Sequence, residues 1–104
     1  MRNPTICEAI RLHQILRFYY DGGFRLVEPF CYGLGTSENE LLRAYQIGGA
    51  SESNEIRGWK LFKVDEISLM SIIDDTFENS HQGYNPNDSI MQQIYCRYSE
   101  KERR

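Results

Sequence analysis

Residues 15–30 read ILRFYYDGGFRLVEPF, and this stretch decides the fold class. Its first part, Ile15–Tyr20, is dense in aromatic and β-branched side chains, which is typical of a β-strand. Residues 21–23, Asp-Gly-Gly, tolerate a positive φ and therefore predict a tight turn. The chain then returns as a second strand over Phe24–Phe30. Pro29 cannot donate a ladder hydrogen bond, so it indicates an edge or the end of that strand.

Three further short strands are expected after this hairpin. They lie at Leu41–Ile47, Trp59–Val64 and Ile67–Ile73, where aliphatic and aromatic residues again predominate. The loop over Gly48–Gly58 is long enough to have a role beyond connection. Short antiparallel strands within about 60 residues favour a small closed or nearly closed barrel, because closure leaves few strand edges exposed.

A short helix is expected before the hairpin. Thr5 and Glu8 have the spacing of a capping box, in which each side chain reaches the other residue's unpaired backbone N–H. Apolar residues then follow at helical intervals from Ile6 to His13. The sequence therefore predicts a helix that begins at Thr5 and packs one face on the barrel.

A second helix is expected near the C-terminus. Another capping-box spacing begins at Ser89, and apolar residues recur at helical intervals over residues 88–98. No repeat or linker divides the chain. The prediction is one mainly β domain over residues 1–104, with the barrel at about 14–78 between two helices.

Composition limits the class of protein. The 104 residues include 12 basic and 15 acidic side chains, so the net charge is −3. A protein that coats nucleic acid is normally basic, so an anionic ligand would need a local cluster of arginines here. No apolar run reaches the roughly 18 residues of a membrane span, and no secretory signal precedes the domain. We therefore expect a cytoplasmic protein with no membrane partner.

The cysteine and histidine spacing gives no metal motif. Cys7, Cys31 and Cys96 are far apart and form no CxxC pair, and His13 and His81 are also distant from each other. We expect three buried free thiols in a reducing compartment rather than a disulfide framework. We expect no metal and no cofactor.

Four segments together resemble the WYL domain family. They are Ile15–Tyr20 with its glycine turn, Arg25–Phe30, Leu41–Gln46 in the place of the Trp-Tyr-Leu strand that names the family, and Gly58–Ile67. The resemblance covers about residues 6–78. It implies a small SH3-like (Sm-like) β-barrel of about five strands.

The same resemblance implies a ligand-sensing role. WYL domains most often follow a winged-helix DNA-binding domain in bacterial transcription regulators, some of them linked to phage defence. Their proposed ligands derive from nucleic acids, such as single-stranded ends or small nucleotides. This chain departs from the pattern at residues 41–43, which read Leu-Leu-Arg, at Glu66 in the place of an arginine, and by having only five residues before Ile6. We expect a stand-alone WYL-like domain, which contacts DNA, if at all, through a separate partner.

Arginines next to tyrosines are the candidate ligand-binding residues. An arginine can bind a phosphate in bidentate fashion, and a neighbouring aromatic ring can stack on a base. Three arginines lie mid-strand on three successive predicted strands, and two more cations lie at the long loop. The predicted set is Arg17, Tyr19, Arg25, Arg43, Tyr45, Arg57 and Lys60.

Other interpretations compete with this one. The arginines could be solvated strand positions paired with Glu28, Glu55 or Asp65, which contributes little to stability. Trp59 is expected to be a core or lid residue rather than a stacking platform. The alternative function is a protein-interaction module, in which the barrel and the C-terminal helix mediate homodimerisation or docking onto a DNA-binding partner.

An enzyme is not expected. Asp74 and Asp75 are adjacent in a predicted extended segment and so point to opposite sides, which suits an acid–base pair poorly. Ser80 and His81 near Asp74 supply the residue types of a hydrolase triad, but no nucleophile elbow accompanies them. Together with the ligand-sensing role that the resemblance to WYL domains implies, this predicts a non-catalytic ligand-sensing domain.

Overall fold

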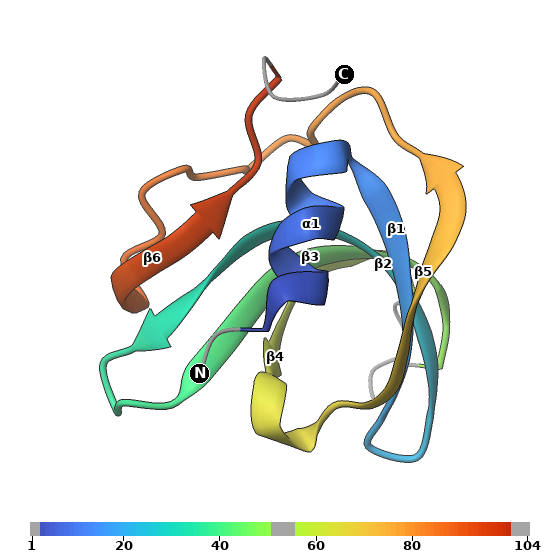
Figure 1. The fold of residues 1–104 in the computed structure, drawn as a ribbon, viewed down its shortest axis with the longest axis horizontal. Coiled ribbons are helices and arrows are strands. Elements are labelled where there is room, and N and C mark those ends of the chain that lie inside the picture. Colours follow the sequence, from blue (N-terminus) through green and yellow to red (C-terminus); the bar gives the residue numbers. More distant parts are fainter. Residues whose placement is uncertain (1–2, 51–55, 101–104) are drawn as a thin grey trace.

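The computed structural model describes residues 3–50 and 56–100 and consists of one short helix and six strands (Figure 1). Helix α1 begins the order, a 3-10 turn η1 joins the fourth and fifth strands, and the last strand is near the C-terminus. The elements are α1 (Pro4–Leu12), β1 (Gln14–Tyr20), β2 (Gly23–Gly35), β3 (Glu40–Gly49), β4 (Gly58–Lys63), η1 (Val64–Glu66), β5 (Ser68–Thr76) and β6 (Met91–Arg97). Part of the predicted long loop, residues 51–55, lies outside the described residues.

All six strands belong to one antiparallel sheet. Its order is β4-β3-β2-β1-β5, and β6 pairs with β2 off this path. The predicted mainly β class is confirmed. The predicted closed barrel is wrong, because no ladder among the described residues joins β4 to β5. Leu69, with φ of 54°, lies in a bulge that interrupts the β1–β5 ladder between Ser68 and Ser71.

The hairpin of β1 and β2 forms as predicted. Asp21 and Gly22 both have positive φ, 48° and 91°, which matches the twist of a two-residue hairpin turn. Leu16 and Phe18 are fully buried on the inner face, whereas Arg17 is exposed on the outer face. The alternation of β1 therefore sets the two faces of the sheet.

The second strand is longer than the sequence indicated. Pro29 was expected at an edge or a strand end, yet β2 continues to Gly35. Pro29 lies where one edge of β2 changes its partner, since pairing with β1 ends at Val27 and pairing with β6 starts at Cys31. No ladder on that edge needs a proline N–H at this position. The lack of an N–H at Pro29 therefore loses no ladder hydrogen bond, and the strand continues past it.

Helix α1 is present but is capped differently from the prediction. The side chain of Asn3, not Thr5, accepts hydrogen bonds from the backbone N–H groups of Thr5 and Ile6. His13 ends the helix with a left-handed backbone at φ of 56°. The apolar stripe is confirmed, because its residues are buried in a core shared with the sheet. That core contains Ile6, Ala9, Ile10, Leu16, Phe18, Val27, Leu42, Ala44 and Phe62.

The predicted C-terminal helix is wrong. Residues 91–97 form strand β6 instead, paired with the second half of β2. Tyr32 of β2 pairs with Cys96, and the backbone N–H of Tyr98 donates to the carbonyl oxygen of Phe30 at 2.7 Å. These partners are far away in the sequence, and the long β2 offers a free edge that a helix could not use.

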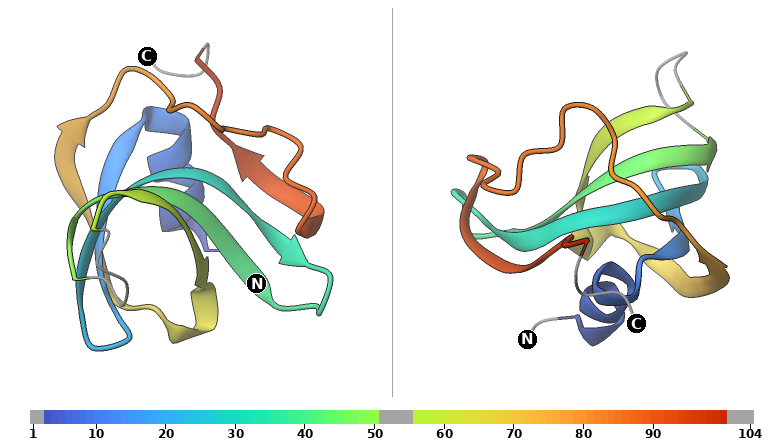
Figure 2. Two further views of the ribbon diagram at one scale, coloured as in Figure 1. Left: turned by 180° about the vertical axis from the view of Figure 1, so that it is seen from behind. Right: turned by 90° about the horizontal axis from the view of Figure 1, so that it is seen from above.

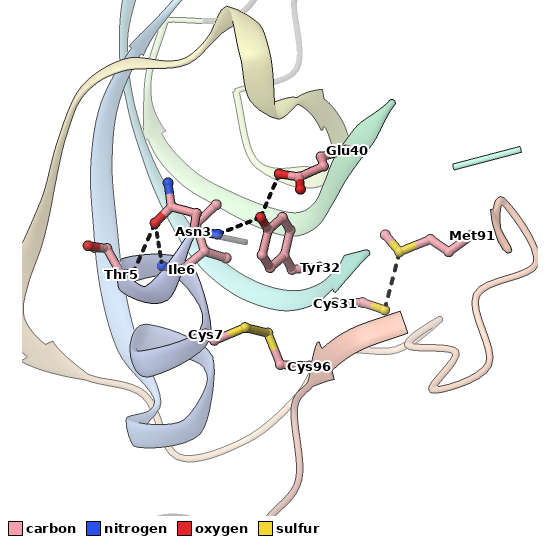
Figure 3. The surroundings of a disulfide bond; sticks show 9 residues. All are labelled: Asn3, Thr5, Ile6, Cys7, Cys31, Tyr32, Glu40, Met91 and Cys96. Carbon is pink, nitrogen blue, oxygen red and sulfur yellow. Dashed lines mark hydrogen bonds between the residues drawn. A yellow bond between two sulfur atoms is a disulfide. The ribbon is translucent and has the colours of Figure 1, made fainter. Parts of the chain in front are cut away.

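Two of the three cysteines are not free thiols. Cys7 of α1 and Cys96 of β6 form a disulfide that joins segments 89 residues apart (Figure 3). Only Cys31 matches the predicted buried free thiol. Disulfides persist mainly in oxidising compartments, so the bond argues weakly against the cytoplasmic location, which stays a prediction. The one helix described is too short to cross a membrane.

Candidate functional site

The connection between β5 and β6, residues 77–90, crosses the outer face of β2 and β3 (Figure 2), and we call it the strap. The His81 ring stacks on Tyr45 with 3.5 Å between ring centroids. His81 Nε2 lies 2.5 Å from Glu28 Oε1, and Trp59 Nε1 donates to the carbonyl oxygen of Gln82 at 2.8 Å. Three neighbouring strands thus hold the first part of the strap.

An ion pair holds the second part of the strap. Arg43 Nε donates to Asp88 Oδ2 at 2.8 Å, and Arg43 Nη2 donates to Asp88 Oδ1 at 3.4 Å. The backbone N–H of Ile90 also donates to Asp88 Oδ1, at 3.2 Å. The Asp88 side chain is 10% exposed and that of Arg43 is 30% exposed. The guanidinium is therefore fixed in orientation while part of it still meets solvent.

A pocket of about 360 Å³ lies beside this ion pair. It is lined by Arg43 of β3, Trp59 of β4 and the strap residues Gly83, Asn85, Asp88 and Ser89. We call it the Arg43–Trp59 pocket. Its volume is within the range of small-molecule sites, at the lower end. Gly83 has φ of 96°, and a Cβ there would lie 3.2 Å from Trp59 Nε1, so this glycine lets the strap pass close to the indole.

The polar groups of the pocket are mostly donors. The Asp88 oxygens already accept hydrogen bonds from Arg43 and Ile90, and Asn85 Oδ1 accepts one from the backbone of Asn87 at 3.0 Å. The pocket also has hydrogen-bond donors that a ligand can use. They are the remaining N–H groups of Arg43, the side-chain amide of Asn85 and the hydroxyl of Ser89. A pocket with donors beside an indole ring can hold an anionic group next to a flat apolar one.

The structure does not bring the predicted arginines onto one face. Arg17 lies on the outer face opposite Leu26, two strands from Arg43 and further along the sheet, with its guanidinium 3.8 Å from the Phe24 ring centroid. Arg25 points inward, is 4% exposed, and donates from Nη2 to the carbonyl oxygen of Tyr20 at 3.0 Å. Only Arg43 of these three lines the pocket.

The other predicted residues also have defined places. Tyr45 is next to Trp59, with 5.4 Å between ring centroids, but the His81 ring covers it. Tyr19 packs edge-on against Phe24, on the outer face near Arg17. Arg57 Nη1 donates to the carbonyl oxygen of Ile47 at 3.0 Å. Lys60 pairs in register with Ala44 and does not line the pocket.

Sequence reasoning missed most of the pocket. Trp59 was expected in a core or lid role, and it does pack on the core, but it also lines the pocket. Asp88, Asn85, Gly83 and Ser89 were not singled out, since a polar stretch gives no local sign of the sheet face it will cover. The available signal was that Trp59 and Tyr45 occupy neighbouring strands with the same side-chain direction.

A buried thiol lies beneath the ion pair. Cys31 pairs in register with Arg43, and its Sγ lies 3.7 Å from the sulfur of Met91. Burial, and next the negative charge of Asp88, raise the pKa of the Cys31 thiol to about 11. The neutral thiol therefore predominates at physiological pH, and Cys31 is not set up as a nucleophile. The described residues also contain no group of three or more metal-ligating side chains.

Comparisons with protein-family models, with curated proteins and with solved structures each gave no match. The resemblance to the WYL family therefore depends on the quoted segments alone. The Arg43–Trp59 pocket is the feature from which a function can be argued.

Proposed function

We propose that this protein is a non-catalytic ligand-binding domain that takes a nucleotide or the end of a short single-stranded nucleic acid. The Arg43–Trp59 pocket carries the proposal. A fixed guanidinium is suited to a phosphate oxygen, and an indole face is suited to a base. The resemblance to WYL domains points to the same ligand class.

The positive charge of Arg43 in the pocket favours phosphate binding, whereas the net negative charge of the whole molecule does not. The chain is net negative, so long-range attraction of an anion is weak. Asp88 also offsets part of the Arg43 charge. Affinity must then come from short-range hydrogen bonds and stacking, which favours a small ligand with one phosphate over a long polyanion.

The test is calorimetric titration with nucleoside 5′-monophosphates and with the matching nucleosides. We expect the monophosphates to bind and the nucleosides to bind much more weakly. Arg43→Met should lower the affinity for monophosphates at least about tenfold, because a charge-assisted hydrogen bond is lost. Arg17→Met is the matched control, since Arg17 is exposed on the same sheet but outside the pocket, and its affinity should be unchanged.

Salt gives an independent criterion. Affinity that depends on a phosphate contact should fall as the salt concentration rises from about 0.05 M to about 0.3 M, because dissolved ions screen the attraction between Arg43 and the phosphate. Equal affinity for nucleosides and monophosphates, or equal losses for both arginine variants, would contradict the proposal.

A second candidate is the interaction module. The C-terminal helix on which it partly depended is absent, but β4 and β5 are the two ends of the strand order. Leu69 of β5 is 70% exposed, and Leu61 of β4 is also exposed. Light scattering of the intact protein and of Leu69→Asp tests this candidate, because a dimer formed through β5 should dissociate in the variant.

A further inference from the structure

The Cys7–Cys96 disulfide lies beside a surface groove. Both cysteines are half-buried and line a groove of about 570 Å³ between α1 and β6. Figure 3 shows the bond between the first part of α1 and the end of β6. Cys31, by contrast, is fully buried. A thiol reagent in solution can therefore reach the disulfide without unfolding the core.

The groove carries charges that favour opening of the bond. Arg11 lies one helical turn after Cys7, Arg97 follows Cys96, and both line the groove together with Glu8. Arg97 Nη1 also donates to Asn87 Oδ1 at 3.1 Å. Cys7 is the fourth residue of α1, near its positive end. Two cations against one anion, together with this helix end, stabilise the thiolate that leaves when a disulfide is attacked.

The disulfide supplements weak attachments of the last strand. Within residues 3–50 and 56–100, strand β6 pairs with β2 alone, and its ladder is interrupted at two positions. After it, the Tyr98 N–H donates to Phe30 O, and His13 Nε2 lies 2.8 Å from Ser99 O. Strand β2 pairs with β1 on one edge and with β3 on the other, and neither cysteine of the disulfide lies in these ladders. Opening the bond should therefore loosen β6 while the rest of the sheet stays folded.

We propose that the Cys7–Cys96 disulfide is a thiol–disulfide exchange site and acts as a reversible latch that holds β6 on α1. Its reaction partner is a dithiol, either a small molecule or a redox protein. One thiolate of the dithiol attacks a sulfur of the pair, and the S–S electrons leave with the other sulfur. The second thiol then closes the dithiol into its own disulfide, so the partner loses two electrons and Cys7 and Cys96 become two thiols.

Such a latch fits the cytoplasmic prediction better than a permanent bond does. Disulfides in reducing compartments are usually transient or redox-sensing. The inference does not depend on the proposed ligand, because its evidence is the groove and the β6 attachments. It nevertheless concerns the strap, since Asp88 and Ser89 come just before β6 in the chain.

The first test counts accessible thiols in the native protein. The oxidised protein is treated with dithiothreitol, then with iodoacetamide, and analysed by mass spectrometry without denaturant. We expect two labels, at Cys7 and Cys96, and none at Cys31. The proposal is overturned if labels appear only after denaturation.

Charge variants test the role of the groove. Arg11→Gln combined with Arg97→Gln should slow reduction by dithiothreitol about two- to fivefold. Lys63→Gln is the matched control, because Lys63 is exposed on β4 and does not line the groove, and its reduction rate should be unchanged. Equal reduction rates in the double arginine variant and the wild-type protein would contradict the assigned role of Arg11 and Arg97.

Hydrogen exchange tests the structural consequence. After reduction, the exchange rates of the amides of residues 91–98 should rise at least about tenfold more than those of β1 and β2, whose rates rise only by the loss of global stability. The Cys7→Ser and Cys96→Ser double variant should show the same pattern without reductant. An equal rise in the exchange rates of β6, β1 and β2 would identify a structural staple instead and overturn the latch.

Discussion

Arg43 and Asp88 illustrate how one ion pair can prepare a binding group at the scale of single residues. Asp88 is nearly buried, so its carboxylate needs a partner, and Arg43 supplies two hydrogen bonds. The desolvation cost of such a pair offsets much of its attraction, so its contribution to stability is modest. Its more important effect is to fix the guanidinium beside Trp59.

The buried thiol gives a prediction for alkaline pH. Burial raises the pKa of Cys31 from its ordinary value of 9.0 to about 11, so the folded state holds this proton more tightly than the unfolded chain does. That contribution to stability is complete below about pH 9 and is lost as the pH rises towards 11. Urea unfolding at pH 8 and pH 10.5 should show a lower free energy of unfolding at the higher pH.

Cys31→Ala is the control for that measurement. The variant lacks the titrating thiol, so its stability should fall less between the same two pH values. Part of the fall will remain, because burial also raises the pKa of Tyr84 to about 12 and raises that of Tyr32. Identical pH profiles for the two proteins would contradict the assignment to Cys31.

Residue-level sequence reasoning identified Arg43 but could not rank it above the other arginines. Strand alternation correctly placed Arg17 and Arg43 on outward-facing positions. It did not place Arg25, because the face of Arg25 depends on the length of the turn: the two-residue turn pairs Arg25 with Phe18, and so on the inner face. Nor could it show that the strap covers Tyr45, because that contact joins residues far apart in the chain.

At the scale of elements, the close approach of β2 and β3 depends on one glycine. Gly49 has φ of 92°, and a Cβ there would lie within 2.2 Å of the carbonyl oxygen of Phe24. Gly49→Ala should therefore lower the free energy of unfolding by about 2 kcal/mol or more. The measurement is urea unfolding followed by circular dichroism.

The neighbouring glycine is a close control. Gly48 has no positive φ, and a Cβ there would lie 3.4 Å from the Leu26 side chain, which is ordinary contact. Gly48→Ala should change stability by less than about 1 kcal/mol. A similar loss in both variants would mean that the backbone conformation at Gly49 is not what limits this position.

The elements that the sequence predicted well are those decided by neighbouring residues. The Asp21–Gly22 turn fixes the β1–β2 hairpin, and the apolar stripe fixes α1. Strand β6 was mistaken for a helix because its apolar residues also fit a helical period. Its true partner is the far half of β2. Pro29 indicated an edge or a strand end, but it gave no sign that β2 continues beyond it and takes a second partner there.

At the scale of the whole molecule, the disulfide connects the two ends of the described chain. It closes a loop with a sequence separation of 89 residues. Chain-entropy arguments for a loop of this length give about 4–5 kcal/mol, and native disulfides typically contribute about 2–5 kcal/mol. The Cys7→Ala and Cys96→Ala double variant should be less stable by that amount but still folded, as judged by thermal unfolding. An unchanged midpoint would contradict this prediction.

The central claim is that a ligand's base lies on Trp59 while its phosphate meets Arg43. Trp59 is the only tryptophan of the chain, so its indole N–H gives a single resonance in a proton–nitrogen NMR spectrum. Titration with a nucleoside monophosphate should shift that resonance in the wild-type protein and leave it in place in Arg43→Met. A resonance that stays fixed in the wild type at millimolar nucleotide would contradict the claim.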